Sequence, residues 1–219
     1  MPVKVWDSPV RLFHWALAAL LVAQVVTGKI GGSAAMTWHL RGGCAILTLV
    51  LFRLVWGVIG SHYARFSSFV RGPAKVLRYA RSLVRPPHDP HVGHNPLGGW
   101  MVLLMLALLL AQAVLGLYAN DDIATDGPWA KFITKDLSDA LSTWHRQLAW
   151  VIVGAAAMHV AAVLYYRVVL RQDVIGPMMT GVKRLPRGLA PEVRRTSIVL
   201  ALVTLALAAA LVWWLVVRL

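Results

Sequence analysis

Eight histidines occur in this 219-residue sequence, and four of them fall inside long apolar stretches. Burying an ionisable side chain in a membrane is costly, so such residues are candidates for function. Imidazole nitrogens ligate metals and haem iron, and they also relay protons. The four candidates are His14, His39, His145 and His159, whereas His62, His88, His91 and His94 lie between the apolar stretches.

Five apolar stretches must position these histidines. Each approaches the roughly 20 apolar residues that a helix needs to cross a bilayer core of about 30 Å. The first carries a His-Trp pair and no clear cleavage pattern, which favours a membrane span over a signal peptide. We therefore predict an all-α integral membrane protein with spans at about 11–28, 37–60, 97–119, 143–166 and 198–217.

The composition agrees with that class. Hydrophobic residues make up 58% of the chain and charged residues 14%, with a mean hydropathy of +0.65. A typical soluble domain has about 45–50% apolar and about 25% charged residues. The single cysteine excludes a disulfide framework, a thiolate metal cluster and the C-x-x-C-H attachment of a c-type haem. The net charge of +13 indicates loops at an anionic membrane surface rather than nucleic-acid binding.

The connections between spans differ sharply in positive charge. Connections 61–96 and 167–197 hold six and seven Lys or Arg residues, whereas 29–36 and 120–142 hold one and two. Because positive charge concentrates on the cytoplasmic side, we expect a cytoplasmic N-terminus and a periplasmic C-terminus in a bacterial inner membrane. Residues 66–84 mix basic and apolar side chains, which predicts an amphipathic helix on the inner membrane surface or, alternatively, a solvated basic loop.

Depth in the membrane sorts the four histidines into two pairs. His145 and His159 are 14 residues apart, which is about 21 Å along a helix and about 40° short of four full turns, so they share one face. Given the direction of each span, His14 is level with His159 on the inner side. His39 is level with His145 on the outer side. Paired imidazoles across a helical bundle are what bis-histidine haem ligation requires.

The neighbours of the histidines suit a flat, anionic macrocycle. Gly42 and Gly43 follow His39 on the same helix face and leave space beside it. Three arginines near the ligand candidates could pair with haem propionates: Arg11, Arg41 and Arg146.

Two other chemistries were weighed against haem. A zinc or copper site needs its ligands clustered, which the 21 Å separation forbids for all four histidines together. A proton relay remains open, although relays normally recruit carboxylates and no Asp or Glu lies inside a span.

Five short motifs resemble the prokaryotic cytochrome b561 family, which includes the b-type cytochrome subunits of nickel–iron hydrogenases and formate dehydrogenases. The matching pieces are DSPVRLFHW (7–15), WHLRGG (38–43), VGHNPLGG (92–99), TWHRQL (143–148) and MHV (158–160). The resemblance covers residues 6 to about 172. It implies a four-helix transmembrane bundle carrying two haem b groups, ligated by His14 with His159 and by His39 with His145.

The resemblance also divides the chain. Residues 1–172 form the expected di-haem bundle, and 173–219 add a basic loop and a fifth transmembrane helix that minimal family members lack. His94 falls in the family-like GHNPLGG piece. It is either a hydrogen-bond donor to an inner haem propionate or a quinone headgroup, or simply part of the helix start at Asn95-Pro96.

Three functions follow as alternatives. The leading hypothesis is a transmembrane cytochrome that transfers electrons between an outer redox partner and membrane quinone, with quinone as the substrate. That partner is a cationic periplasmic protein such as a c-type cytochrome, or a hydrogenase- or dehydrogenase-type complex, and a homo-oligomer is possible. The second is a superoxide:quinone oxidoreductase, an activity attributed to some four-span members of the family. The third is a haem-free transporter or assembly protein.

Overall fold

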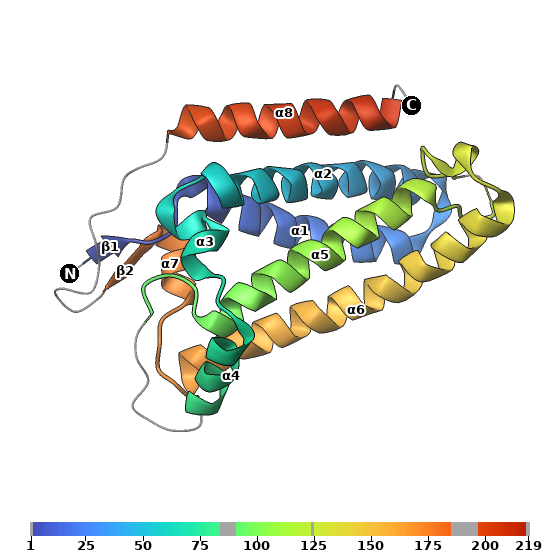
Figure 1. The fold of residues 1–219 in the computed structure, drawn as a ribbon. Helices are drawn as coiled ribbons and strands as arrows, with labels where there is room; N and C mark the ends of the chain where they lie inside the picture. The colour runs from blue at the N-terminus through green and yellow to red at the C-terminus, as the bar shows by residue number, and fades with distance from the viewer. Residues whose placement is uncertain (1, 84–90, 124, 185–196, 218–219) are drawn as a thin grey trace.

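Five long helices dominate the computed structural model, which describes residues 2–83, 91–123, 125–184 and 197–217 (Figure 1). All five are long and apolar enough to cross a membrane. The predicted spans are thus confirmed, although the fourth helix begins at Lys135 rather than near 143. The helices are α1 (Ser8–Ile30), α2 (Gly32–Ile59), α5 (Pro96–Tyr118), α6 (Lys135–Val168) and α8 (Ile198–Val217).

The first four of these helices form two matching hairpins. Helices α1 and α5 are each 23 residues long, and each starts after a capping side chain, Asp7 or Asn95, that accepts a backbone N–H three residues on. Their second halves read ALLVAQVVTG (19–28) and ALLLAQAVLG (107–116), and their partner helices carry TWH at 37–39 and 143–145. The repeat has no single period because the second connection is longer.

Packing joins the hairpins into one four-helix bundle. Helix α1 packs on α2, α5 packs on α6, and α2 also contacts α5 (Figure 1). Helix α8 lies outside this bundle along α2, where Ala201, Ala208 and Val212 are buried. The Trp129 indole also donates to the Leu215 carbonyl at 2.8 Å. The fifth helix is therefore an addition to the bundle rather than part of it.

One end of the bundle, called here the basic end, gathers the short elements (Figure 1). Strand β1 (Pro2–Lys4) pairs antiparallel with β2 (Val182–Arg184), a small sheet that the sequence did not predict. The other short elements are η1 (His62–Ala64), α3 (Phe66–Phe69), α4 (Pro73–Ser82) and α7 (Ile175–Thr180).

The segment expected to form one amphipathic helix over 66–84 is divided at this end. Helix α3 turns inward, and Phe69 is only 3% exposed. Helix α4 starts afresh at Pro73, because proline suits the first turn of a helix but not its interior. Residue 84 lies outside the described residues, as do residues 185–196 of the predicted basic loop that precedes α8.

The opposite end, called here the acidic end, holds the connection from α5 to α6, including η2 (Ala130–Phe132). Buried Asn120 organises it by donating from its side chain to Ser138 Oγ at 2.6 Å and to Asp139 at 2.8 Å. Lys135 forms ion pairs with Asp122 and Asp139. Two of the five aspartates at this end therefore share the charge of one lysine.

Candidate functional sites

The acidic end of the bundle core holds one histidine pair. His39 on α2 and His145 on α6 face each other with ring centres 6.1 Å apart. The Nδ1 of His145 lies 3.0 Å from the backbone carbonyl of Gln112, and the Nδ1 of His39 lies 3.2 Å from that of Gln24. In addition, the amides of Gln24 and Gln112 each donate to the backbone carbonyl of the histidine they face, at 3.0 Å.

The basic end holds the second pair. His14 on α1 and His159 on α6 have ring centres 6.3 Å apart. Unlike its counterparts, the buried Nδ1 of His14 has no hydrogen-bond partner among the described residues. The structure thus brings together the same two pairs that depth in the membrane predicts. Their role as iron ligands stays a prediction.

The ring separations test whether a haem iron fits between the partners. A metal–imidazole bond of about 2 Å, added to about 1 Å from nitrogen to ring centre, gives about 6 Å between the centres of two rings that share one metal. Both observed separations, 6.1 and 6.3 Å, match that value. No group of three or more His, Cys, Asp or Glu side chains in the described part of the chain could hold a metal ion. The residues therefore fit bis-histidine iron rather than a clustered metal site.

Glycines make room for the acidic-end rings. A Cβ on Gly28 would lie 3.0 Å from Cε1 of His39, and one on Gly116 would lie 3.0 Å from Cε1 of His145. Of the glycines the sequence singled out, a Cβ on Gly42 would instead lie 2.1 Å from the Gln24 amide, whereas Gly43 faces open space. Gly42 thus accommodates a glutamine, and only Gly43 leaves free volume beside His39.

The three predicted arginines lie in different surroundings. Arg41 is exposed and stands over the Trp38 ring at 5.3 Å, and exposed Arg146 donates to Thr143 Oγ1 at 3.1 Å. Arg11 donates to the Met179 carbonyl, while its buried Nε has no partner among the described residues. Of the three, Arg11 alone combines partial burial with an unused donor.

His94 lies deep in the basic end, between the Trp6 ring at 4.5 Å and the Phe69 ring at 4.4 Å. Burial, and then the positive charge of Arg53, lower its pKa to about 3, with His159 and His14 adding smaller effects. His94 is therefore neutral at physiological pH, and its buried Nδ1 is unpartnered among the described residues.

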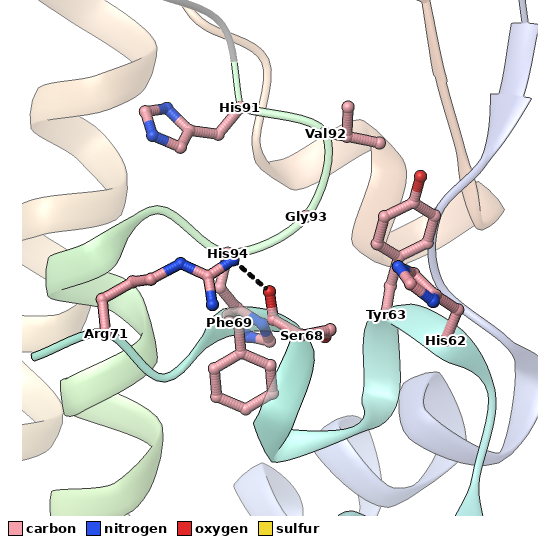
Figure 2. Close-up of a pocket in the computed structure, with 9 residues that line it drawn as sticks. All are labelled: His62, Tyr63, Ser68, Phe69, Arg71, His91, Val92, Gly93 and His94. Atoms are coloured by element: carbon pink, nitrogen blue, oxygen red, sulfur yellow. Dashed lines mark hydrogen bonds between the residues drawn. The ribbon is translucent and has the colours of Figure 1, made fainter. Parts of the chain in front are cut away.

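A pocket of about 260 Å³ opens beside His94 (Figure 2). It is lined by η1, α3 and residues 91–94, and the Arg71 guanidinium at its edge donates to the Ser68 carbonyl at 2.7 Å. The buried hydroxyl of Tyr63, which also lines the pocket, has no hydrogen-bond partner within the described ranges. His91 lines it too, whereas His88 falls outside those ranges.

Sequence reasoning missed several residues of these sites. Gln24 and Gln112, each followed by glycine four residues on, are detectable only when the two hairpins are aligned with each other. Arg53 is 2% exposed and lies over the Phe66 ring at 5.0 Å, an ionisable span residue that received no role. The sequence does mark Arg53 as a candidate, because it is a charged residue within an apolar stretch.

A membrane-spanning helical bundle with paired core histidines defines the class of membrane-bound b-type cytochromes. The chain belongs to the prokaryotic cytochrome b561 family, whose sequence profile matches residues 5–181. It is thus a multi-pass membrane protein of a family that binds haem b and transfers electrons. Helix α8 lies beyond the matched region.

Curated relatives support the assignment. A probable Ni/Fe-hydrogenase B-type cytochrome subunit from Bradyrhizobium diazoefficiens is 24% identical, covering 82% of this chain and 85% of its own. The corresponding protein from Cupriavidus necator is 27% identical over 81% and 85% of the two chains. A probable Ni/Fe-hydrogenase 1 B-type cytochrome subunit from Escherichia coli is 23% identical over 81% and 88%. No solved structure matches this chain significantly.

Proposed function

We propose that this protein is a di-haem cytochrome that carries electrons across the membrane between a redox partner at the acidic end and quinone at the basic end. The observation that carries the proposal is the presence of two histidine pairs, each with ring centres about 6 Å apart, at opposite ends of one bundle. Each bound haem would supply a one-electron carrier.

The chain's own residues hold and isolate these carriers. His14 and His159 would ligate one iron, and His39 and His145 the other. The unused Nε of Arg11 and the neutral His94 suit the propionates of the basic-end haem. Arg41 and Arg146 serve the acidic-end haem from the surface. Apolar side chains around both pairs exclude water, which tunes the potential.

Haem content tests this ligation. A pyridine haemochrome assay should give two haems per chain. His39→Ala or His145→Ala should remove one haem, and His14→Ala or His159→Ala the other. The exposed His62 provides the matched control, since His62→Ala should keep both. A wild-type content of one haem or none would refute the proposal.

We infer that quinone reacts at the basic end. The pocket beside His94 opens there, next to the His14–His159 pair, and offers Tyr63 and Arg71 as polar contacts for a headgroup. Dithionite-reduced protein, freed of excess reductant, should be reoxidised by short-chain ubiquinone or menaquinone analogues. Failure with both analogues would remove quinone from the proposal.

We infer that a redox protein docks at the acidic end. The relatives are named as hydrogenase subunits, which favours a hydrogenase-type complex. The surplus of acidic residues also suits a cationic cytochrome. Co-purification of a tagged chain with a hydrogenase from its own membranes supports the first partner, and stoichiometric electron exchange with a basic cytochrome supports the second.

A further inference from the structure

The two histidine pairs differ in what their Nδ1 atoms contact. A backbone carbonyl oxygen can only accept a hydrogen bond, so the Nδ1 atoms of His39 and His145 must carry their protons and donate them to Gln24 and Gln112. The Nε2 atoms are thereby left unprotonated, as metal ligation requires. In His145 the Gln112 amide donor lies 3.2 Å from Nε2, which agrees with the same tautomer and is a contact that ligation would replace.

His39 has a second acceptor. Thr27 Oγ1 lies 3.2 Å from its Nδ1 and donates its own proton to the Ala23 carbonyl at 2.7 Å. The threonine hydroxyl therefore presents a lone pair to the imidazole N–H. In the second hairpin the equivalent position is Leu115, which has no hydroxyl.

At the basic end, His14 lacks this arrangement. The Nδ1 of His14 is buried without an acceptor in the described part of the chain. The carboxylate that caps the same helix, Asp7, is engaged by the Val10 amide and the Trp56 indole.

Resting on the haem ligation of the proposed function, we propose that Gln24, Thr27 and Gln112 make the acidic-end haem the low-potential centre and the basic-end haem the high-potential centre. An acceptor on Nδ1–H makes the imidazole a more basic ligand, which stabilises oxidised iron and lowers its reduction potential. Thr27 is a positioning residue, because it acts through His39.

Electrons then run downhill from the acidic end to the basic end. With both haems bound, one electron from a reduced redox protein would enter at the centre held by His39 and His145 and pass to the centre held by His14 and His159. Two such electrons in succession, together with two protons from the basic side, convert one quinone to quinol.

Potentiometric titration of the haem absorbance tests this assignment. Two midpoint potentials are expected, and the lower one should be lost in His39→Leu. Thr27→Val removes one acceptor while keeping the side-chain shape. We expect it to raise the lower midpoint by about 28 mV, which is a threefold change in the equilibrium constant for one electron. The higher midpoint should stay unchanged.

Two further variants test whether the hydroxyl group is responsible for the shift in the lower midpoint potential. Thr27→Ser retains the hydroxyl and should leave both midpoints in place. Leu115→Thr adds a hydroxyl at the equivalent position of the second hairpin and should lower the lower midpoint further. The g values of the low-spin ferric signal in electron paramagnetic resonance should move for the same haem only.

The outcomes separate this inference from the function beneath it. Fewer than two bis-histidine haems in the wild type would refute the proposed function. The inference alone would be overturned if two haems are present but neither Thr27→Val nor Leu115→Thr shifts the lower midpoint. It would also be overturned if His39→Leu removes the higher midpoint. If the Thr27→Val variant does not assemble with haem, the direction in which Leu115→Thr shifts the lower midpoint potential tests the inference instead.

Discussion

Two glycines control whether the acidic-end imidazoles can occupy their positions. A side chain at Gly28 or Gly116 would approach Cε1 of the facing histidine to 3.0 Å, closer than ordinary carbon contacts. Both rings also hold their Nδ1 protons against a carbonyl one turn earlier on the same neighbouring helix. Steric fit and hydrogen bonding therefore fix each ring from the same side.

We expect Gly28→Ala and Gly116→Ala to displace these rings and deplete the acidic-end haem. Overpacking of this kind costs about 1–3 kcal/mol. The measurement is haem content per chain together with the amplitude of the lower-potential wave. Gly154→Ala on α6 is the control, because a Cβ there meets nothing within 4 Å. Full occupancy in both variants would show that the rings have more freedom than the contacts indicate.

Acid should destabilise the fold through His94. Its pKa is about 3 in the folded protein, against 6.5 for an ordinary histidine, so the unfolded chain binds the proton more readily. Stability is therefore fully present above about pH 6.5 and falls as the pH drops from there toward 3, by up to about 1.4 kcal/mol per pH unit. Above pH 7 no dependence is expected from this group.

Thermal unfolding of wild type and His94→Gln at pH 7.5 and 5.0 measures the effect. The wild type should lose more stability between the two values than the variant, because glutamine does not titrate. His62→Gln, a change at an exposed histidine, should follow the wild type. Equal losses in wild type and His94→Gln would assign the acid sensitivity to other groups.

At the scale of elements, α8 stands apart from the electron-transfer core. It contributes no histidine, and its buried contacts with α2 rest on small side chains such as Ala201 and Ala208. We expect a chain truncated after residue 184 to keep two haems and both midpoint potentials, while unfolding at a lower temperature. Loss of one haem on truncation would instead make α8 part of the site.

The connection at the acidic end offers exposed charges for docking. Asp126 and Asp136 are exposed, whereas Asp122 and Asp139 are held by Lys135. Rim charges act mainly on association rate. We therefore expect a variant carrying Asp126→Asn and Asp136→Asn to exchange electrons more slowly with a basic cytochrome at low salt, with unchanged haem spectra.

Stopped-flow mixing at 10 mM and 0.15 M salt checks the docking surface. The difference from wild type should shrink at 0.15 M, where the Debye length is about 8 Å. Asp173→Asn at the basic end is the matched control and should leave the rate unaltered. A wild-type rate for the double variant at 10 mM salt would exclude this surface.

At the scale of the whole molecule, charge is segregated along the bundle axis. The short elements of the basic end and the residues that join them carry nine of the 17 described Lys and Arg residues, and the acidic end carries five aspartates. Five spans then place the two termini on opposite sides of the membrane. From the positive-inside rule we expect the basic end to face the cytoplasm.

Reporter fusions test this orientation. Alkaline phosphatase joined after Leu219 should be active, and a fluorescent protein at the same position should be dark. In the variant truncated after residue 184 the two results should exchange, because one span has been removed. The opposite pattern for the full chain would place the acidic end, and not the basic end, in the cytoplasm.

The sequence by itself determined the membrane class, the five spans and the pairing of the histidines by depth. Hydropathy identifies spans because a bilayer demands about 20 apolar residues, and a fixed helical rise converts residue number into depth. His14 and His159 could therefore be matched without coordinates, as could His39 and His145.

Only the tertiary structure decided how each helix is rotated about its axis and what its side chains meet. That rotation brings the carbonyl of Gln24 to His39 and that of Gln112 to His145, and it leaves His14 Nδ1 without an acceptor among the described residues. It also buries Arg53, while chain closure pairs β1 with β2. Packing between segments far apart in the chain sets these contacts, and no local pattern encodes it.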